Sequence, residues 1–292
     1  KMLSELYEDK LFQTRIHFKT ILEEGFRIIK ENDNTFNVYC SLFKRYIYCL
    51  DTINLLIADF NFELKHREQS IAIVLRASLL DYLTTLYLRT YYAEKKAEVK
   101  SLKSTYDVEL DKLLSDQLKR ILTVSKKNKQ TSAYNHESFC KTVDNIYNNF
   151  KSLFDESIPI DYENPSKSLK YSSRNDEITN SEIRVRLDNF SKNLKGIDYL
   201  HVFSLYDIYS KYDHFGVMSM LLENMEIDEV CENMLWSIFH ITDGISFCVD
   251  LLKDEVGCKS DFEKMLNEID YLRGVIYTRT FWLSKEYKEK NQ

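Results

Sequence analysis

The segment Ile71-Ala-Ile-Val-Leu-Arg76-Ala-Ser78-Leu-Leu-Asp81-Tyr82-Leu-Thr-Thr85-Leu-Tyr-Leu-Arg89 is apolar on nearly every side of a helix. Such a helix is typical of the centre of a bundle, where neighbouring helices cover all of its faces. The chain around it contains only two prolines, Pro159 and Pro165. Because proline is costly inside helices, we expect two helical tracts, residues 1–156 and 181–292, joined by an irregular connector over 157–180.

Apolar residues that recur at three- and four-residue steps predict the individual helices. The expected helices cover about 4–31, 35–61, 64–94, 106–126, 136–154, 179–194, 198–211, 228–254 and 259–288. Short connections favour antiparallel neighbours, and no strand-like alternation extends beyond a few residues. The prediction is an all-α fold, an extended multi-helix bundle of mostly antiparallel long helices, with the second tract packed on the first as one domain.

The composition limits the classes of partner. The net charge is −6 and the six cysteines form no C-x-x-C pair, so we expect reduced thiols in a cytoplasmic protein. The negative charge argues against a broad nucleic-acid or anionic-membrane surface, although a local basic pocket for RNA stays open. Charged residues such as Asp51, Arg76 and Asp81 interrupt the most apolar segments, so no membrane span is expected.

The common motifs of nucleotide-dependent and hydrolytic enzymes are missing. No G-x-x-x-x-G-K-[ST], G-x-G-x-x-G or G-x-S-x-G occurs in the sequence. A helical di-iron site needs two E-x-x-H pairs; Glu63 with His66 forms one, and Asp198 with His201 is an imperfect second. We therefore expect no cofactor and no metal.

Polar side chains on the central helix predict the candidate site. One stripe, at about 100° of rotation per residue, holds Ser78, Asp81, Thr85 and Arg89. Arg76 points almost opposite to this stripe. Both directions cannot face water on so apolar a helix, so either Arg76 or Asp81 should point inward and have a partner. A structural ion pair, or an Arg76 side chain that reaches the surface along its aliphatic stem, is the alternative to a functional site.

The expected partner is the polar end of a later helix, Tyr209-Ser210-Lys211-Tyr212-Asp213-His214-Phe215-Gly216. A histidine beside a cation suits acid–base chemistry or phosphate binding. The candidate catalytic cluster is therefore Arg76, Asp81, Lys211 and His214, with Ser210 and Tyr212 as binding residues. Alternatively, His214 only complements the dipole of a helix C-terminus.

The segments Leu75-Arg76-Ala-Ser-Leu-Leu-Asp81-Tyr82 and Tyr209-Ser210-Lys-Tyr-Asp-His214 resemble a group of uncharacterised bacterial all-helical proteins. These carry an Arg-small-x-x-acid run on a central helix and a Ser-x-x-x-His turn on a later one, and they are distantly similar to HEPN proteins. The resemblance implies a helical bundle and an RNA-processing or phage-defence ribonuclease. HEPN nucleases place an arginine shortly before a histidine on one helix; here Arg76 would have to supply that cation from another helix.

Three functions follow from these observations. The first, which we expect, is a non-catalytic interaction module that binds a protein partner or a second copy of itself and uses the polar cluster structurally. The second is the HEPN-like ribonuclease. The third is a helical bundle that binds a small ligand.

Overall fold

A computed structural model describes residues 2–32, 37–58, 60, 67–97, 105–127, 135–173, 178–190, 198–211 and 225–290. These residues form nine α-helices and two short 3-10 turns, which confirms the predicted all-α class. The chain divides into two compact units, residues 1–86 with 196–292 (unit 1) and residues 87–195 (unit 2). The helix bounds agree closely with the apolar periodicity.

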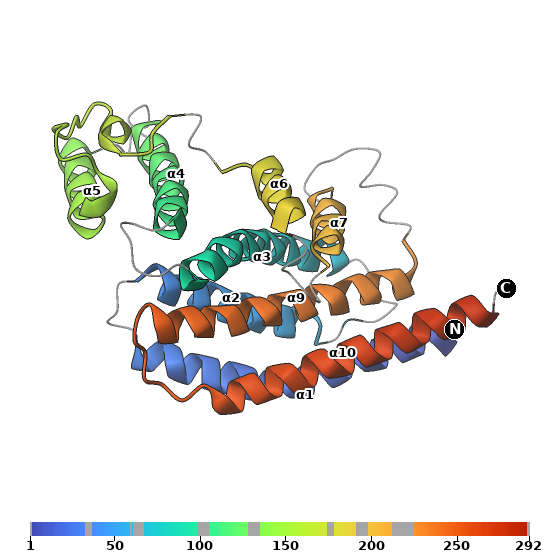
Figure 1. Ribbon diagram of the computed structural model, residues 1–292. Helices are drawn as coiled ribbons and strands as arrows, with labels where there is room; N and C mark the ends of the chain where they lie inside the picture. The colour runs from blue at the N-terminus through green and yellow to red at the C-terminus, as the bar shows by residue number, and fades with distance from the viewer. Residues whose placement is uncertain are drawn as a thin grey trace. The chain divides into compact units, whose positions relative to one another are not determined.

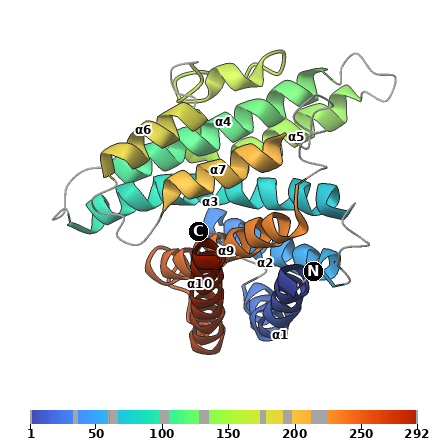
Figure 2. The same cartoon turned by 90° about the vertical axis from the view of Figure 1, so that its right-hand side faces the viewer.

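Unit 1 is a bundle of long helices (Figures 1 and 2). Its elements are α1 (Met2–Glu31), α2 (Val38–Leu56), the first part of α3 (Glu68–Ala97), α7 (Tyr199–Ser210), α9 (Ile227–Asp254) and α10 (Glu263–Lys290). Helices α1 and α10 lie side by side and antiparallel, and both contact α9. Helix α2 packs between α1 and α9, so α9 is buried along most of its length.

Helices α3 and α9 are long and apolar enough to cross a membrane. Their most apolar windows have a mean hydropathy of 1.5 and 1.3, and 61% and 78% of these windows are buried inside the protein. Core helices of bundles have the same length and composition, because their neighbours cover nearly every face. Length and composition alone therefore do not assign either helix to a membrane.

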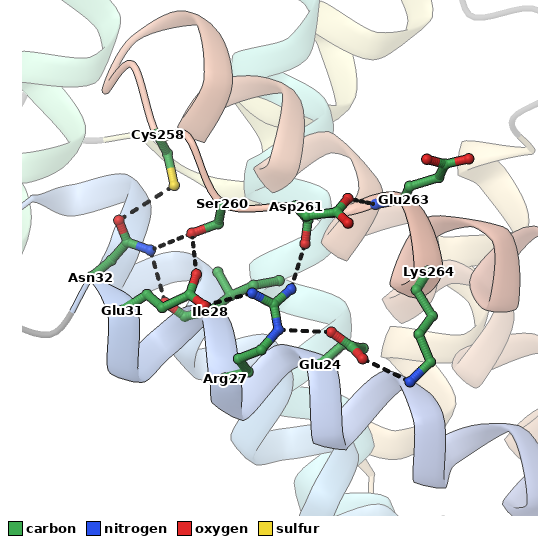
Figure 3. A network of polar contacts seen from close by, with 10 residues as sticks. All are labelled: Glu24, Arg27, Ile28, Glu31, Asn32, Cys258, Ser260, Asp261, Glu263 and Lys264. Atoms are coloured by element: carbon green, nitrogen blue, oxygen red, sulfur yellow. Dashed lines mark hydrogen bonds and ion pairs between the residues drawn. The ribbon is translucent and has the colours of Figure 1, made fainter.

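A polar network joins the end of α1 to the segment between α9 and α10 (Figure 3). Arg27 donates to Glu24 and Glu31 on its own helix and to the carbonyl oxygen of Asp261. Ser260 donates to Glu31 at 2.6 Å, and Lys264 pairs with Glu24 at 2.8 Å. Most of these groups are exposed, so the network fixes the geometry of the α9–α10 connection more than it adds stability.

Unit 2 has a hydrophobic core of its own. It contains the end of α3, α4 (Thr105–Lys127), α5 (His136–Asn149), η3 (Lys151–Leu153), η4 (Pro165–Ser168) and α6 (Asn180–Phe190). The core residues are Leu118, Leu122, Phe139, Val143, Leu153, Phe154 and Leu169. Phe154 and Leu169 also pair through a single antiparallel bridge.

The boundaries of the two units differ from those of the predicted tracts. The described part of the expected connector, residues 157–173, is irregular apart from η4, but it lies inside unit 2. The units instead divide within α3, after Leu86, and again at 195–196. Prolines mark where helices stop, but they carry no information about which helices share a core.

Candidate functional site

Asp81 forms an ion pair with an arginine that the sequence analysis did not single out. Arg45 on α2 donates from Nε and Nη2 to the carboxylate at 2.8–2.9 Å. The Asp81 side chain is 19% exposed. Burial raises the pKa of this carboxyl, and the adjacent Arg45 guanidinium counters only part of that effect. Among the described residues, the ion-pair partner of Asp81 therefore comes from α2.

Arg76 lies in a different place. It is half-buried, and its guanidinium carbon is 6.0 Å from the centre of the Tyr206 ring on α7. The polar stripe of α3 faces the interior at Ser78 and Thr85, which are buried. Their hydroxyls donate to the Val74 and Asp81 carbonyl oxygens of their own helix.

The end of α7 is described only in part. Ser210 donates its hydroxyl to the Asp207 carbonyl oxygen at 2.8 Å, and Lys211 is exposed at the helix C-cap. Tyr212 and His214 lie outside the described residues, as do Glu63 and His66. Among the predicted residues that are described, Arg76 contacts Tyr206 of α7 and Asp81 pairs with Arg45 of α2.

A polar triad lies inside unit 1. Tyr82 on α3 donates its hydroxyl to Asp243 on α9 at 2.7 Å. Asp243 pairs with Arg273 on α10 at 3.0 Å, and the guanidinium stacks over the Phe239 ring at 4.5 Å. Tyr82 and Asp243 are both buried. The triad therefore joins three helices through one carboxylate that is shielded from solvent.

A buried histidine lies next to this triad. His240 stacks on Tyr82 with ring centroids 5.5 Å apart and contacts the rings of His201, Trp236 and Phe239. Neither ring nitrogen has a hydrogen-bond partner among the described residues. Burial, followed by the nearby His201 and Arg273, lowers the pKa of His240 to about 3. The imidazole is therefore neutral at physiological pH and serves as an aromatic packing group.

Unit 2 holds a second triad of the same kind, which lines an open pocket. Tyr87 on α3 donates its hydroxyl to Glu109 on α4 at 2.6 Å, and Lys112 pairs with Glu109 at 2.8 Å. Burial and the hydrogen bond to Glu109 raise the pKa of Tyr87. The pocket has a volume of about 430 Å³ and is also lined by α6. No group of three His, Cys, Asp or Glu side chains in the described ranges is placed to hold a metal ion.

The outer face of α1 carries large apolar side chains. Between Leu11 and Lys30 the exposed positions are Phe12, Ile16, Lys19, Glu23, Phe26 and Lys30, which we call the α1 stripe. Phe12, Ile16 and Phe26 are 58%, 64% and 38% exposed. The exposed Tyr48 of α2 extends the stripe, with its ring centroid 6.1 Å from that of Phe26.

Comparison with known proteins provides no relative for this chain. No family model matches it, and no curated protein or solved structure matches it either.

Proposed function

We propose that this protein is a non-catalytic helical interaction module that pairs with a second copy of itself through the α1 stripe. The exposed apolar side chains of that stripe support the proposal most strongly. Exposed apolar groups that lie together on one helix face are typical of a contact surface. The triad inside unit 1 is shielded and internally paired, as expected of a structural cluster.

The order of charges in the α1 stripe favours a second copy as the partner. In an antiparallel pairing centred at the level of Ile21, Lys19 of one copy lies opposite Glu23 of the other, because both are equally far from the centre. The same register brings Ile16 opposite Phe26. Within one chain no ion pair joins Lys19 and Glu23 among the described residues, although they are neighbours on the helix.

The ends of the stripe fit the same register. Phe12 comes opposite Lys30 of the second copy, where an ammonium group can lie over an aromatic ring. The arrangement is isologous, which is the usual form of a two-fold dimer interface. A stable dimer buries about 1,200–2,000 Å² in total, so the flanking Tyr48 and Leu55 of α2, both exposed, would contribute to the interface as well.

Charge reversal tests this proposal. Sedimentation velocity of the wild type should give a dimer. Lys19→Glu and Glu23→Lys should each weaken it at least tenfold, because each places like charges opposite one another. The double variant should restore association, since the opposite charges face each other again. The matched control is Lys141→Glu, an exposed position on α5, which should change nothing.

Two outcomes would contradict the proposal. One is a wild type that stays monomeric at high micromolar concentration. The other is a double variant that associates no better than the two single variants, since this would exclude the antiparallel register.

One observation favours a second candidate, the HEPN-like ribonuclease. The Arg76 guanidinium lies 6.0 Å from the Tyr206 ring centre, so the first segment that carries the resemblance contacts α7, the helix on which the second segment begins. If this function is real, Arg76→Ala and His214→Ala should each reduce degradation of a mixed RNA pool, whereas Arg120→Ala, exposed on α4, should not. Equal degradation by all of these proteins would remove this candidate.

A further inference from the structure

The pocket of unit 2 has two charged side chains on one helix that do not bind each other. Glu182 and Arg186 lie four residues apart on α6, and both line the pocket. A glutamate and an arginine at this spacing ordinarily attract each other on a helix surface. Here no ion pair joins them within the described residues, because each has other partners.

Arg186 is held in a fixed orientation. Its Nε donates to the Thr90 hydroxyl at 2.8 Å, and its Nη2 pairs with Glu94 at 2.9 Å. The guanidinium lies 3.8 Å from the centre of the Tyr91 ring and 4.9 Å from that of Phe190. No hydrogen bond or ion pair of Nη1 is found among the described residues, and Nη2 has no hydrogen bond beyond the Glu94 ion pair, so N–H groups of this arginine are available at the pocket that it lines.

Glu182 is held at the start of the same helix. Its Oε2 accepts hydrogen bonds from the backbone N–H and the hydroxyl of Thr179 at 2.7 and 3.0 Å. Thr179 Oγ1 accepts from the Glu182 backbone N–H at 3.2 Å in return, which makes a capping box. No contact of Oε1 is found in the part of the chain that the structure describes. One carboxylate oxygen is therefore available one helical turn before the arginine.

The remaining walls add apolar surface and no unbalanced charge. Glu109 accepts from both Lys112 and Tyr87, so the charges of Glu109 and Lys112 offset each other. Ile178 and Val185 line the pocket with apolar side chains, and Val185 is exposed. The volume of about 430 Å³ lies within the range of small-molecule sites.

We infer that this pocket binds a small zwitterion of the α-amino-acid class with an apolar side chain. The ligand carboxylate would accept from Arg186 Nη1, where charge-assisted hydrogen bonds are strongest. The adjacent ammonium would donate to Glu182 Oε1, and the apolar side chain would contact Ile178 and Val185. A ligand with only one of the two charges would leave either Arg186 Nη1 or Glu182 Oε1 without a hydrogen bond from the ligand. This inference does not depend on the α1 stripe.

Three probes of nearly the same shape test the charge requirement. Isothermal titration of the full chain with L-phenylalanine should show binding. Phenethylamine lacks the carboxylate and 3-phenylpropanoate lacks the ammonium, and each should bind at least tenfold more weakly. Equal affinity for all three compounds, or no heat with L-phenylalanine at millimolar concentration, would overturn the inference.

Variants of α6 locate the site. Glu182→Gln keeps the capping geometry but removes the charge, so it should weaken L-phenylalanine at least tenfold and leave 3-phenylpropanoate unchanged. Val185→Trp should block the pocket without changing any charge. The control, Arg184→Trp, is exposed on α6 and outside the pocket lining, and it should bind like the wild type. Unchanged binding by both Glu182→Gln and Val185→Trp would refute this location.

Discussion

Two tyrosines of α3, Tyr82 and Tyr87, each donate a hydrogen bond to a buried carboxylate that also pairs with a cation. In unit 1 the carboxylate is Asp243, and its partner Arg273 lies over the Phe239 ring, whereas in unit 2 the carboxylate is Glu109 and the triad lines an open pocket. The same chemistry thus serves two roles. A sealed triad joins helices, and an open one can form the floor of a binding site.

Removal of the Asp243 carboxylate should have the largest effect on the stability of the protein. Asp243→Ala leaves Arg273, whose side chain is 24% exposed but whose Nε is buried, without its ion-pair partner, which should lower the free energy of unfolding by about 3 kcal/mol. Glu109→Ala should cost less, about 1–2 kcal/mol, because pocket water can solvate Lys112. Urea unfolding measures both. Asp270→Ala, exposed on α10, is the control and should change stability by less than about 0.5 kcal/mol.

Equal losses for Asp243→Ala and Glu109→Ala would contradict the distinction between a sealed and an open triad. A loss below about 1 kcal/mol for Asp243→Ala would show that solvent reaches the interior of unit 1.

The buried histidine should make unit 1 sensitive to acid. The folded pKa of His240 is about 3, whereas an unfolded histidine titrates near 6.5. Between these values the unfolded state binds the proton and the folded state does not, so stability falls as the pH falls, by at most about 1.4 kcal/mol per pH unit. His240→Phe should flatten this slope, as measured by urea unfolding from pH 7 to pH 4.

The matched control for acid sensitivity is His136→Phe at the exposed start of α5, which should leave the slope unchanged. The prediction fails if His240→Phe retains the wild-type slope, because protonation of other groups would then explain the acid sensitivity.

Two glycines of unit 1 should show how closely its helices pack, with smaller changes in stability than those expected for Asp243→Ala. A methyl group at Gly244 would lie 2.7 Å from the Tyr46 ring, whereas one at Gly274 meets no atom within 4 Å. Gly244→Ala should therefore destabilise by about 1–3 kcal/mol. Gly274→Ala should stabilise by up to about 1 kcal/mol, because alanine favours helix. The midpoint temperature of thermal unfolding should fall for Gly244→Ala and rise for Gly274→Ala. A shift in the same direction for both variants would contradict the close contact between Gly244 and Tyr46.

The helices could be predicted from the sequence because apolar periodicity records which face of each helix is buried. The partners of the charged groups could not. The sequence places Asp81 on an inward stripe, but nothing near it in the chain indicates Arg45. The pocket was missed for the same reason: Glu109 and Arg186 come from separate helices, and each looks like an ordinary surface charge of an amphipathic helix.

The central claim is that two copies of α1 meet antiparallel at the level of Ile21. Electron–electron distances between nitroxide labels test it directly, in a background where the half-buried Cys49, Cys140 and Cys258 are replaced by serine. With a rise of 1.5 Å per residue, labels at the half-buried Thr20 and Gln13, which lie beside the stripe and not in it, should be separated along the axis by about 3 Å and about 24 Å respectively. Equal distances at the two sites, or no dipolar coupling at either, would contradict the claim.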